Sequence, residues 1–245
     1  MMRRAQPWLG TLVEAGVTGA GNAATAIDAA FAAVARAERL MSRQRGDSDL
    51  GRLNTAAPHD AVPVDPDTAR VLARARALHA QTRGAFDPGG LGAASCGFDL
   101  DETIAWRTDA RARISLDGIA KGHAVDAAVE AMRAAGADAG WVNAGGDLRA
   151  FGNLSLPVRL RLGATGRDII VSNSALASSE FGDARPPRAT STLRAHGGRR
   201  PCVLGAAVIA PECWIADALT KVVTVMGRRA APWLEDWGAT PVWQA

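Results

Sequence analysis

The chain has 245 residues, 48% of them apolar, and its formal charge is +3. This length suits one large domain or two small ones with a substantial core. No apolar run is long enough to span a membrane, and the basic residues are dispersed, which argues against a transmembrane or nucleic-acid-binding protein. The start, Met1 to Trp8, lacks the apolar stretch of a signal peptide and predicts a cytoplasmic location.

Cysteine and lysine are both scarce. The cysteines, Cys96, Cys202 and Cys213, show no C-x-x-C spacing, so neither a disulfide framework nor a zinc site is predicted. Of the 28 basic residues, only Lys121 and Lys221 are lysine. Such a skew is most simply a coding bias. The two remaining lysines are still candidate functional residues, because a compact ammonium on a flexible stem forms interactions that a planar guanidinium does not.

The first half of the chain predicts one strand and two helices. Residues 9–17 alternate in polarity as a strand does, and the apolar residues that follow recur at helical spacing. The predicted elements are a strand at residues 9–17, a helix capped by Asn22 and continuing to Met41, a loop over Ser42 to Pro66, and a helix from Asp67 or Thr68 to about Gly84.

The second half is predicted to be rich in strands. After turn residues at Gly84 to Gly92, the predicted strands are Ile114 to Leu116, Gly140 to Asn143, Leu148 to Phe151, Pro157 to Leu162, Asp168 to Ser172, Ala189 to Leu193 and Val203 to Ile209. The predicted helices are Gly118 to Ala135, Pro211 to Met226 and Ala231 to Trp237. Because no repeat or linker is visible, residues 1–245 are interpreted as one compact α+β domain, with a mixed, mainly antiparallel sheet and peripheral helices.

The first motif, Ser115 to Asp126, places glycines and a lysine at the beginning of a predicted helix. Glycines such as Gly118 allow a ligand to approach the backbone, a helix N-terminus favours anions, and Lys121 adds a mobile positive charge. This combination suits a pyrophosphate. Ordinary packing is the more common explanation of so short a motif, and it stays open.

The second motif, Trp141 to Arg149, contains a double glycine between two predicted strands. Gly145 and Gly146 permit either a tight hairpin or the close approach of a flat ring, and Asn143 and Asp147 offer polar groups at the turn. A plain hairpin explains the pattern nearly as well as a ligand site.

The third motif lies in the last long predicted helix. Asp217, Thr220 and Lys221 share one helix face, because residues three and four positions apart are neighbours. A carboxylate and a hydroxyl at this spacing suit a magnesium ion that keeps waters and phosphate oxygens as its other ligands. An ion pair between Asp217 and Lys221 accounts for the same spacing equally well.

Taken in this order, the three motifs resemble the FAD:protein FMN transferase (ApbE-like) family. The resemblance covers residues 9 to 227. Its matching segments are Leu9 to Thr11, Asp47 to Asn54, Phe86 to Pro88, Cys96 to Phe98, Ser115 to Asp126, Asn143 to Asp147 and Ala216 to Leu219. The resemblance implies an enzyme that binds FAD, splits its pyrophosphate with Mg²⁺, and attaches FMN through a phosphoester to a threonine or serine of an acceptor protein.

The resemblance also implies roles for individual residues. Lys121 and Asp217 would be catalytic. The residues implied to contact the flavin nucleotide are Leu9, Gln44, Cys96, Gly97, Phe98, Ser115, Lys121, Asn143, Gly145 and Gly146. The residues implied at the metal are Gly118, through its backbone oxygen, Asp217, Thr220 and Lys221.

Several positions depart from the family pattern. Ser115 replaces an aspartate, Asp117 a glycine, Leu9 a methionine, Gln44 an aromatic residue and Cys96 a tryptophan. The expected H-[IV]-x-D-P-x-T-G segment is not recognisable, and Ser191 to Gly198 stand in its place.

One departure falls on the implied metal site. Lys221 occupies the position of the metal-binding threonine, and Thr220 is one residue early, about 100° around the helix. The hypothesis that follows is that the Lys221 ammonium replaces part of the metal's charge and weakens or abolishes magnesium binding.

Three functions are consistent with these residues. The first is magnesium-dependent transfer of FMN from FAD to a protein hydroxyl. The second is a non-catalytic flavin-binding or accessory protein, favoured by the unrecognisable segment and by Lys221. The third is an FAD pyrophosphatase that gives FMN and AMP.

Overall fold

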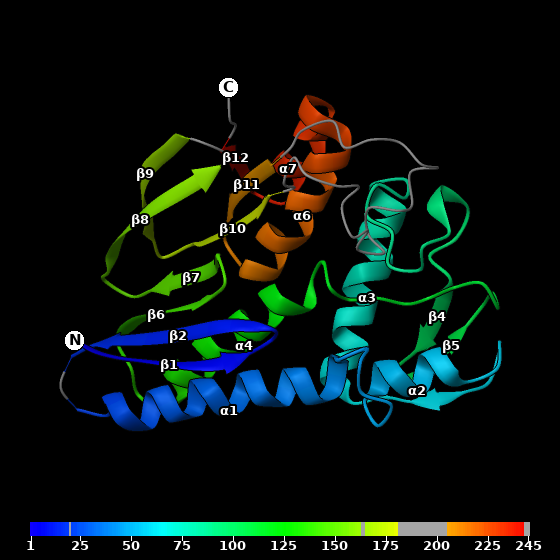
Figure 1. The fold of residues 1–245 in the computed structure, drawn as a ribbon, viewed down its shortest axis with the longest axis horizontal. Helices are drawn as coiled ribbons and strands as arrows, with labels where there is room; N and C mark the ends of the chain where they lie inside the picture. The colour runs from blue at the N-terminus through cyan, green and yellow to red at the C-terminus, as the bar shows by residue number, and fades with distance from the viewer. Residues whose placement is uncertain (20, 163–164, 181–204, 243–245) are drawn as a thin grey trace.

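The structure is a computed structural model that describes residues 1–19, 21–162, 165–180 and 205–242. A seven-stranded antiparallel sheet in the order β1-β2-β6-β7-β10-β11-β12 forms its centre (Figure 1). The strands of this sheet are β1 (Met2–Trp8), β2 (Thr11–Thr18), β6 (Ala139–Ala144), β7 (Asp147–Phe151), β10 (Ala175–Glu180), β11 (Gly205–Ala210) and β12 (Thr240–Val242).

Three helices cover one face of this sheet: α1 (Ala23–Met41), α4 (Ala120–Ala134) and α6 (Cys213–Met226). Alternation along the strands explains the layer, since Val13, Ala15 and Val17 of β2 point into a core shared with α1 and α4. The opposite face is covered by a hairpin of β8 (Ser155–Leu162) and β9 (Thr165–Ser172).

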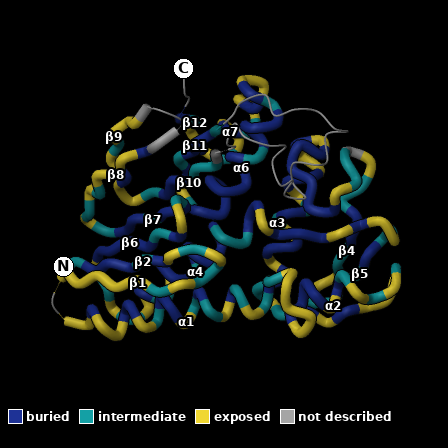
Figure 2. Tube along the Cα trace, in the orientation of Figure 1, coloured by how far each residue is buried: buried dark blue, intermediate teal, exposed yellow. Residues whose placement is uncertain are grey.

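A second group of elements packs beside α6 and extends the core away from the sheet (Figure 2). Its members are α2 (Asp49–Thr55), α3 (Pro66–Gln81), the short helix η1 (Gly92–Ala94), and a small sheet of β3 (Val62–Pro63), β4 (Phe98–Asp101) and β5 (Ile104–Arg107). The chain ends with η2 (Gly227–Ala230), α7 (Ala231–Asp236) and β12. One cluster of buried residues joins α2, α3 and β4 to α6, so the two groups form a continuous core.

The predicted fold class, a compact α+β domain with a mainly antiparallel sheet and peripheral helices, is confirmed, and every strand pair in the described residues is antiparallel. The extent of this domain, residues 1–245, stays a prediction. The predicted strand at Ala189 to Leu193 lies outside the described residues.

Several predicted elements are wrong. Ile114 to Leu116 form no strand, and the segment predicted as a loop contains α2, whose start is capped by the Ser48 hydroxyl accepting the Gly51 N–H. Strand β1 and the pair β4–β5 were not predicted. β1 and β5 lack a clear alternation of apolar and polar residues, and β4 alternates over only four residues. No helix in the described parts of the chain is long and apolar enough to cross a membrane.

Candidate active site

The β1–β2 connection is a two-residue turn. Leu9 and Gly10 both have positive φ, +56° and +70°, as a type I′ turn requires. This conformation is strained for leucine, and it is held by the Leu9 N–H, which donates to Glu38 Oε2 at 2.7 Å. The sequence analysis did not identify Glu38 as a site residue. Its position was a possible signal of a function, because an acidic residue in the last turn of a helix is disfavoured by the helix dipole.

The β6–β7 connection is a second turn of the same kind, and it lies against the first. Gly145 and Gly146 have φ of +59° and +103°, and Asn143 Oδ1 accepts the Gly146 N–H at 3.0 Å. A Cβ on Gly145 would lie only 2.5 Å from Oγ1 of Thr11. The hairpin interpretation of the second motif is therefore confirmed, and it places this turn beside the Leu9 turn.

The first and third motifs meet where α4 and α6 cap each other. The Asp126 carboxylate of α4 accepts the N–H groups of Cys213 and Trp214, the first residues of α6, at 2.9 and 2.8 Å. In return, Asp217 Oδ2 of α6 accepts the Gly122 N–H at 3.0 Å. Buried amide groups need such acceptors, so the two acids fix the helices relative to each other. Asp126 had no role assigned from the sequence.

Gly122 is required where the two helices touch, because a Cβ there would lie 2.4 Å from the Cys213 carbonyl oxygen. We expect Gly122→Ala to destabilise the protein by about 3 kcal/mol or more, although alanine favours helix by about 1 kcal/mol. Urea unfolding measures this change. Gly46→Ala is the control, since a Cβ at Gly46 meets nothing within 4 Å. Equal stabilities of the two variants would refute the close packing of α4 on α6.

Four charged groups lie together behind these contacts. Lys121 Nζ is 3.1 Å from Asp147 Oδ2, and Lys221 Nζ is 2.5 Å from Asp217 Oδ1 and donates to Ser179 Oγ at 3.1 Å. Both aspartates are fully buried. Burial and the nearby Asp217 raise the pKa of Asp147. Burial disfavours the Lys121 ammonium, but Asp147 and Asp217 outweigh it and raise the Lys121 pKa, so this lysine remains charged.

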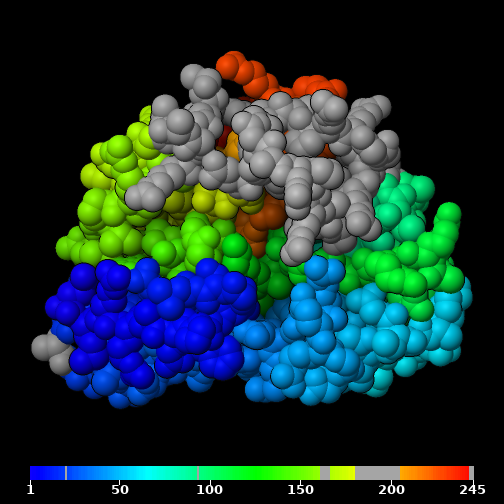
Figure 3. Space-filling model, in the orientation of Figure 1, coloured from blue at the N-terminus to red at the C-terminus, as the bar shows by residue number. Residues whose placement is uncertain are grey.

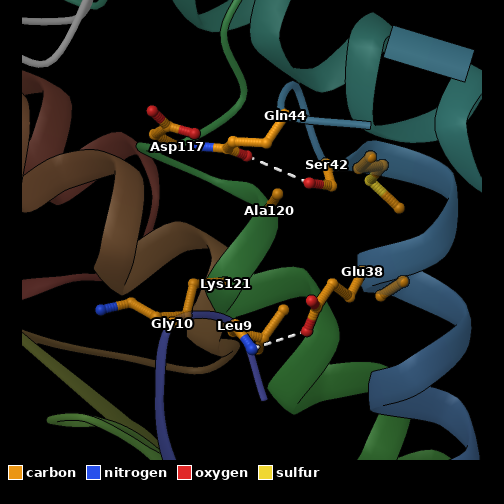
Figure 4. A pocket seen from close by; sticks show the side chains of 10 residues that line it. Leu9, Gly10, Glu38, Ser42, Gln44, Asp117, Ala120 and Lys121 are labelled. Carbon is orange, nitrogen blue, oxygen red and sulfur yellow. Dashed lines mark hydrogen bonds between the residues drawn. The ribbon is translucent and has the colours of Figure 1, made fainter. Parts of the chain in front are cut away.

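A pocket of about 530 Å³ adjoins this cluster (Figure 4). Such a volume is typical of small-molecule sites. The residues that line it are Leu9, Gly10, Ala37, Glu38, Met41, Ser42, Gln44, Asp117, Ala120 and Lys121. They come from the β1–β2 turn, the end of α1 with the segment that follows it, and the beginning of α4 with the turn that precedes it. In Figure 3 the N-terminal strands, in dark blue, lie next to the lighter blue segment after α1, with green atoms recessed between them.

Three of the residues predicted to bind the flavin nucleotide line this pocket: Leu9, Gln44 and Lys121. Asp117 joins them, and its carboxylate forms an ion pair with Arg43 at 3.0 Å. The Lys121 side chain points away from Glu38 (Figure 4). The pocket therefore combines apolar walls with one ammonium and two carboxylates.

The other predicted flavin-binding residues are not among those that line this pocket. Phe98 is 2% exposed and belongs to the core, and a Cβ on Gly97 would lie 2.7 Å from the Ala112 side chain. Ser115 is buried, with its N–H on the Pro88 carbonyl oxygen. Their contact with a flavin, like that of Cys96, Asn143, Gly145 and Gly146, stays a prediction.

The backbone at the beginning of α4 offers less to an anion than the sequence suggested. The N–H groups of Ile119 and Ala120 donate to the Leu116 carbonyl oxygen, and that of Gly122 donates to Asp217. These amides are therefore engaged. The positive charge that the first motif brings to the pocket is that of Lys121.

The implied magnesium residues do not fit a metal as they stand. Lys221 and Gly122 already occupy the two carboxylate oxygens of Asp217, as the ion-pair interpretation predicted. The Thr220 hydroxyl donates to the Asp217 carbonyl oxygen at 2.7 Å. Gly118 is buried at the turn before α4. Within the described ranges, no group of three or more His, Cys, Asp or Glu side chains is arranged to hold a metal ion.

His123 lies in a second cavity, of about 370 Å³, between α3 and α4. It is 5% exposed, and its Nδ1 is 3.5 Å from an Arg74 guanidinium nitrogen. Burial, assisted by the charge of Arg74, lowers the pKa of His123 to about 4. The imidazole is therefore neutral at pH 7 in the folded protein.

A pH dependence of stability follows from this lowered pKa. Between about pH 6.5 and 4 the unfolded chain protonates His123 but the folded chain does not, so stability is lost as the pH falls. From pH 7 to 4.5 we expect wild type to lose about 2 kcal/mol more than His123→Phe. Urea unfolding at both pH values measures this, and parallel losses in the two proteins would contradict the prediction. The comparison is needed because Asp126, whose pKa burial raises to about 6, acts in the opposite direction.

The solved structures with the same fold include two flavin transferases and one further ApbE protein. The Pseudomonas stutzeri flavinyl transferase ApbE in its apo form is 16% identical with a TM-score of 0.84, covering 100% of this chain and 91% of that one. The flavin transferase ApbE from Vibrio cholerae is 18% identical with a TM-score of 0.84, covering 98% and 92%. The ApbE protein from Thermotoga maritima is 22% identical with a TM-score of 0.83, covering 97% and 91%. At these identities the likeness concerns the fold alone.

Comparison with curated protein sequences gives no match. The sequence model of the ApbE family, in contrast, matches residues 9–96 and 92–240. Those two ranges contain both turns, the pocket, and the α4–α6 contact with its four charges. This chain is a member of the ApbE family.

Proposed function

We propose that this protein transfers FMN from FAD to a threonine or serine hydroxyl of an acceptor protein. The observation that carries the proposal is the pocket on which Leu9, Gln44 and Lys121 converge, in a member of the ApbE family whose solved relatives include flavin transferases. The acceptor protein, like a cytoplasmic location, belongs to the proposal.

The proposed reaction is a displacement at phosphorus. The acceptor oxygen bonds to the phosphorus on the riboflavin side of the FAD pyrophosphate, and the bond from that phosphorus to the bridging oxygen breaks. AMP leaves with the bridging oxygen, and the hydroxyl proton is released to solvent. Negative charge moves onto AMP, so a fixed ammonium at the phosphates stabilises the transition state.

Lys121 is the residue that supplies this charge in the proposal. It lines the pocket, its ammonium is oriented by Asp147, and its raised pKa keeps it protonated at neutral pH. Asp217 acts less directly, because it holds Lys221 and the Gly122 N–H. We therefore propose Asp217 as a positioning residue. Magnesium dependence, which the family resemblance implies, stays a prediction. The hydrogen bonds that already occupy both carboxylate oxygens of Asp217 argue against it.

One assay separates the three functions considered from the sequence. Purified protein is incubated with FAD, with and without a candidate acceptor, and AMP, free FMN and protein-bound flavin are measured. Transfer gives AMP together with flavin that stays on the acceptor after denaturation. AMP and free FMN without labelled acceptor would indicate a pyrophosphatase. Bound flavin without AMP would indicate a binding protein, which the unrecognised family segment favours.

A further inference from the structure

We propose that the ammonium groups of Lys121 and Lys221 together take the place of a divalent cation, so that this member of the family handles the FAD pyrophosphate without a bound metal ion. The inference rests on the proposed function for its chemistry. The observations behind it concern described residues of α4, α6, β7 and β10.

Both carboxylate oxygens of Asp217 already have a partner. Oδ2 accepts the Gly122 N–H at 3.0 Å, and Oδ1 lies 2.5 Å from Lys221 Nζ. The side chain is 0% exposed, so no water replaces either partner. A metal ion that reached this carboxylate would have to displace the ammonium or lie within a few ångströms of it, where two positive charges repel each other strongly.

The Thr220 hydroxyl, on the same helix, also has its hydrogen bonds within the protein. Thr220 Oγ1 donates to the Asp217 carbonyl oxygen at 2.7 Å and lies 3.0 Å from Ser179 Oγ. It is fully buried on α6. Mg²⁺ requires several oxygen ligands in near-octahedral geometry, and these two residues do not present a pair of free oxygens.

The Lys221 ammonium is held by two partners. Its side chain is 13% exposed, and its ammonium bridges Asp217 of its own helix and Ser179 of β10. An ammonium has three donors, so one remains. Lys121 is paired with Asp147 at 3.1 Å and lines the pocket, and its ammonium has further donors besides the one on Asp147.

The two ammonium groups belong to one unit. Lys121 precedes Gly122, whose N–H is bonded to the carboxylate that holds Lys221. Because α4 and α6 touch at the Gly122 backbone, the packing of the two helices limits how far the residues that carry these charges can move apart. Two ammonium groups match the two negative charges of a pyrophosphate, which is the role of a divalent cation in phosphoryl transfer.

Binding of Mn²⁺, followed by electron paramagnetic resonance of the free ion, tests the inference without requiring activity. Wild type should leave added Mn²⁺ free. Lys221→Thr removes the competing charge and offers a hydroxyl, so it should bind Mn²⁺ about 100-fold more tightly than wild type. Lys221→Arg keeps the charge and should behave as wild type. Tight binding by wild type, unchanged in Lys221→Thr, would overturn the inference, and the wild-type titration decides this even if a variant does not fold.

AMP release from FAD, measured with a candidate acceptor protein present, gives the second readout. Wild type should retain its rate in excess EDTA, whereas Lys221→Thr should require added Mg²⁺. A wild-type rate that EDTA abolishes and Mg²⁺ restores would also overturn the inference. If no condition yields AMP, the proposed function fails, while the Mn²⁺ titration still decides whether the lysines exclude a metal.

Discussion

Replacement of Lys121 by methionine should lower the rate of AMP release from FAD by about 10² to 10³-fold, the loss typical when one fixed donor to a developing negative charge is removed. Methionine has a similar length and flexibility but no charge. Lys121 contributes both a wall of the pocket and the ammonium paired with Asp147, so its loss affects the site directly. Chromatographic measurement of AMP over time gives the rate.

The same substitution leaves the buried Asp147 without its cation, so a stability control is required. The double variant Lys121→Met/Asp147→Asn removes both charges and should regain most of the stability lost in Lys121→Met. Its rate should stay as low as that of the single variant. A double variant that is stable and as active as wild type would show that Lys121 has only a structural role.

Substitution of Asp126 by alanine should cost about 3–5 kcal/mol of stability, the range found when one partner of a buried ion pair is removed. Two buried N–H groups at the beginning of α6 would lose their acceptor, and Arg149, 2.9 Å from this carboxylate, would lose its closest counter-charge. Urea unfolding at pH 7 measures the change.

The matched control for Asp126→Ala is Asp168→Ala. Asp168 also pairs with an arginine, Arg159, at 2.7 Å, but its side chain is 75% exposed. An exposed pair of this kind contributes at most about 1 kcal/mol, so little stability should be lost. Similar losses in both variants would contradict the assigned role of Asp126 in joining α4 to α6.

The helices and the central strands could be predicted from the sequence because their periodicity is local. α1, α3, α4 and α6 all lie within a few residues of their predicted bounds. The missed elements β4, β5 and α2 are short, so each carries little periodic signal. β4 pairs with β5, and β5 also pairs with β3, in a small sheet apart from the main one. α2 is a short helix of seven residues within a segment rich in turn formers.

The sequence predicted those parts of the site whose motifs contain glycines and charged residues. The sequence could place Asp217 and Lys221 on one helix face, but it could not decide between a metal ligand and an ion pair, since both need the same spacing. The structure has the ion pair. Glu38 and Asp126 could not be assigned, because their partners, Leu9 and the beginning of α6, are adjacent only in the folded chain.

The predicted anion site at the beginning of α4 illustrates a further limit. A helix N-terminus with glycines suggests free amide groups, yet the Gly122 N–H is taken by a carboxylate 95 residues further along the chain. Glycine is required at position 122 because its backbone packs closely against Cys213. Local sequence suggests which groups are available, but tertiary contacts decide which of them remain free.

Transfer of FMN is tested most directly with FAD labelled separately at its two phosphorus atoms, in the presence of a candidate acceptor protein. We predict that the label on the riboflavin side becomes covalently attached to the acceptor, while an equal amount of the label on the adenosine side is released as AMP. Release of both labels as free nucleotides, or attachment of the adenosine-side label to the acceptor, would contradict flavin transfer by this protein.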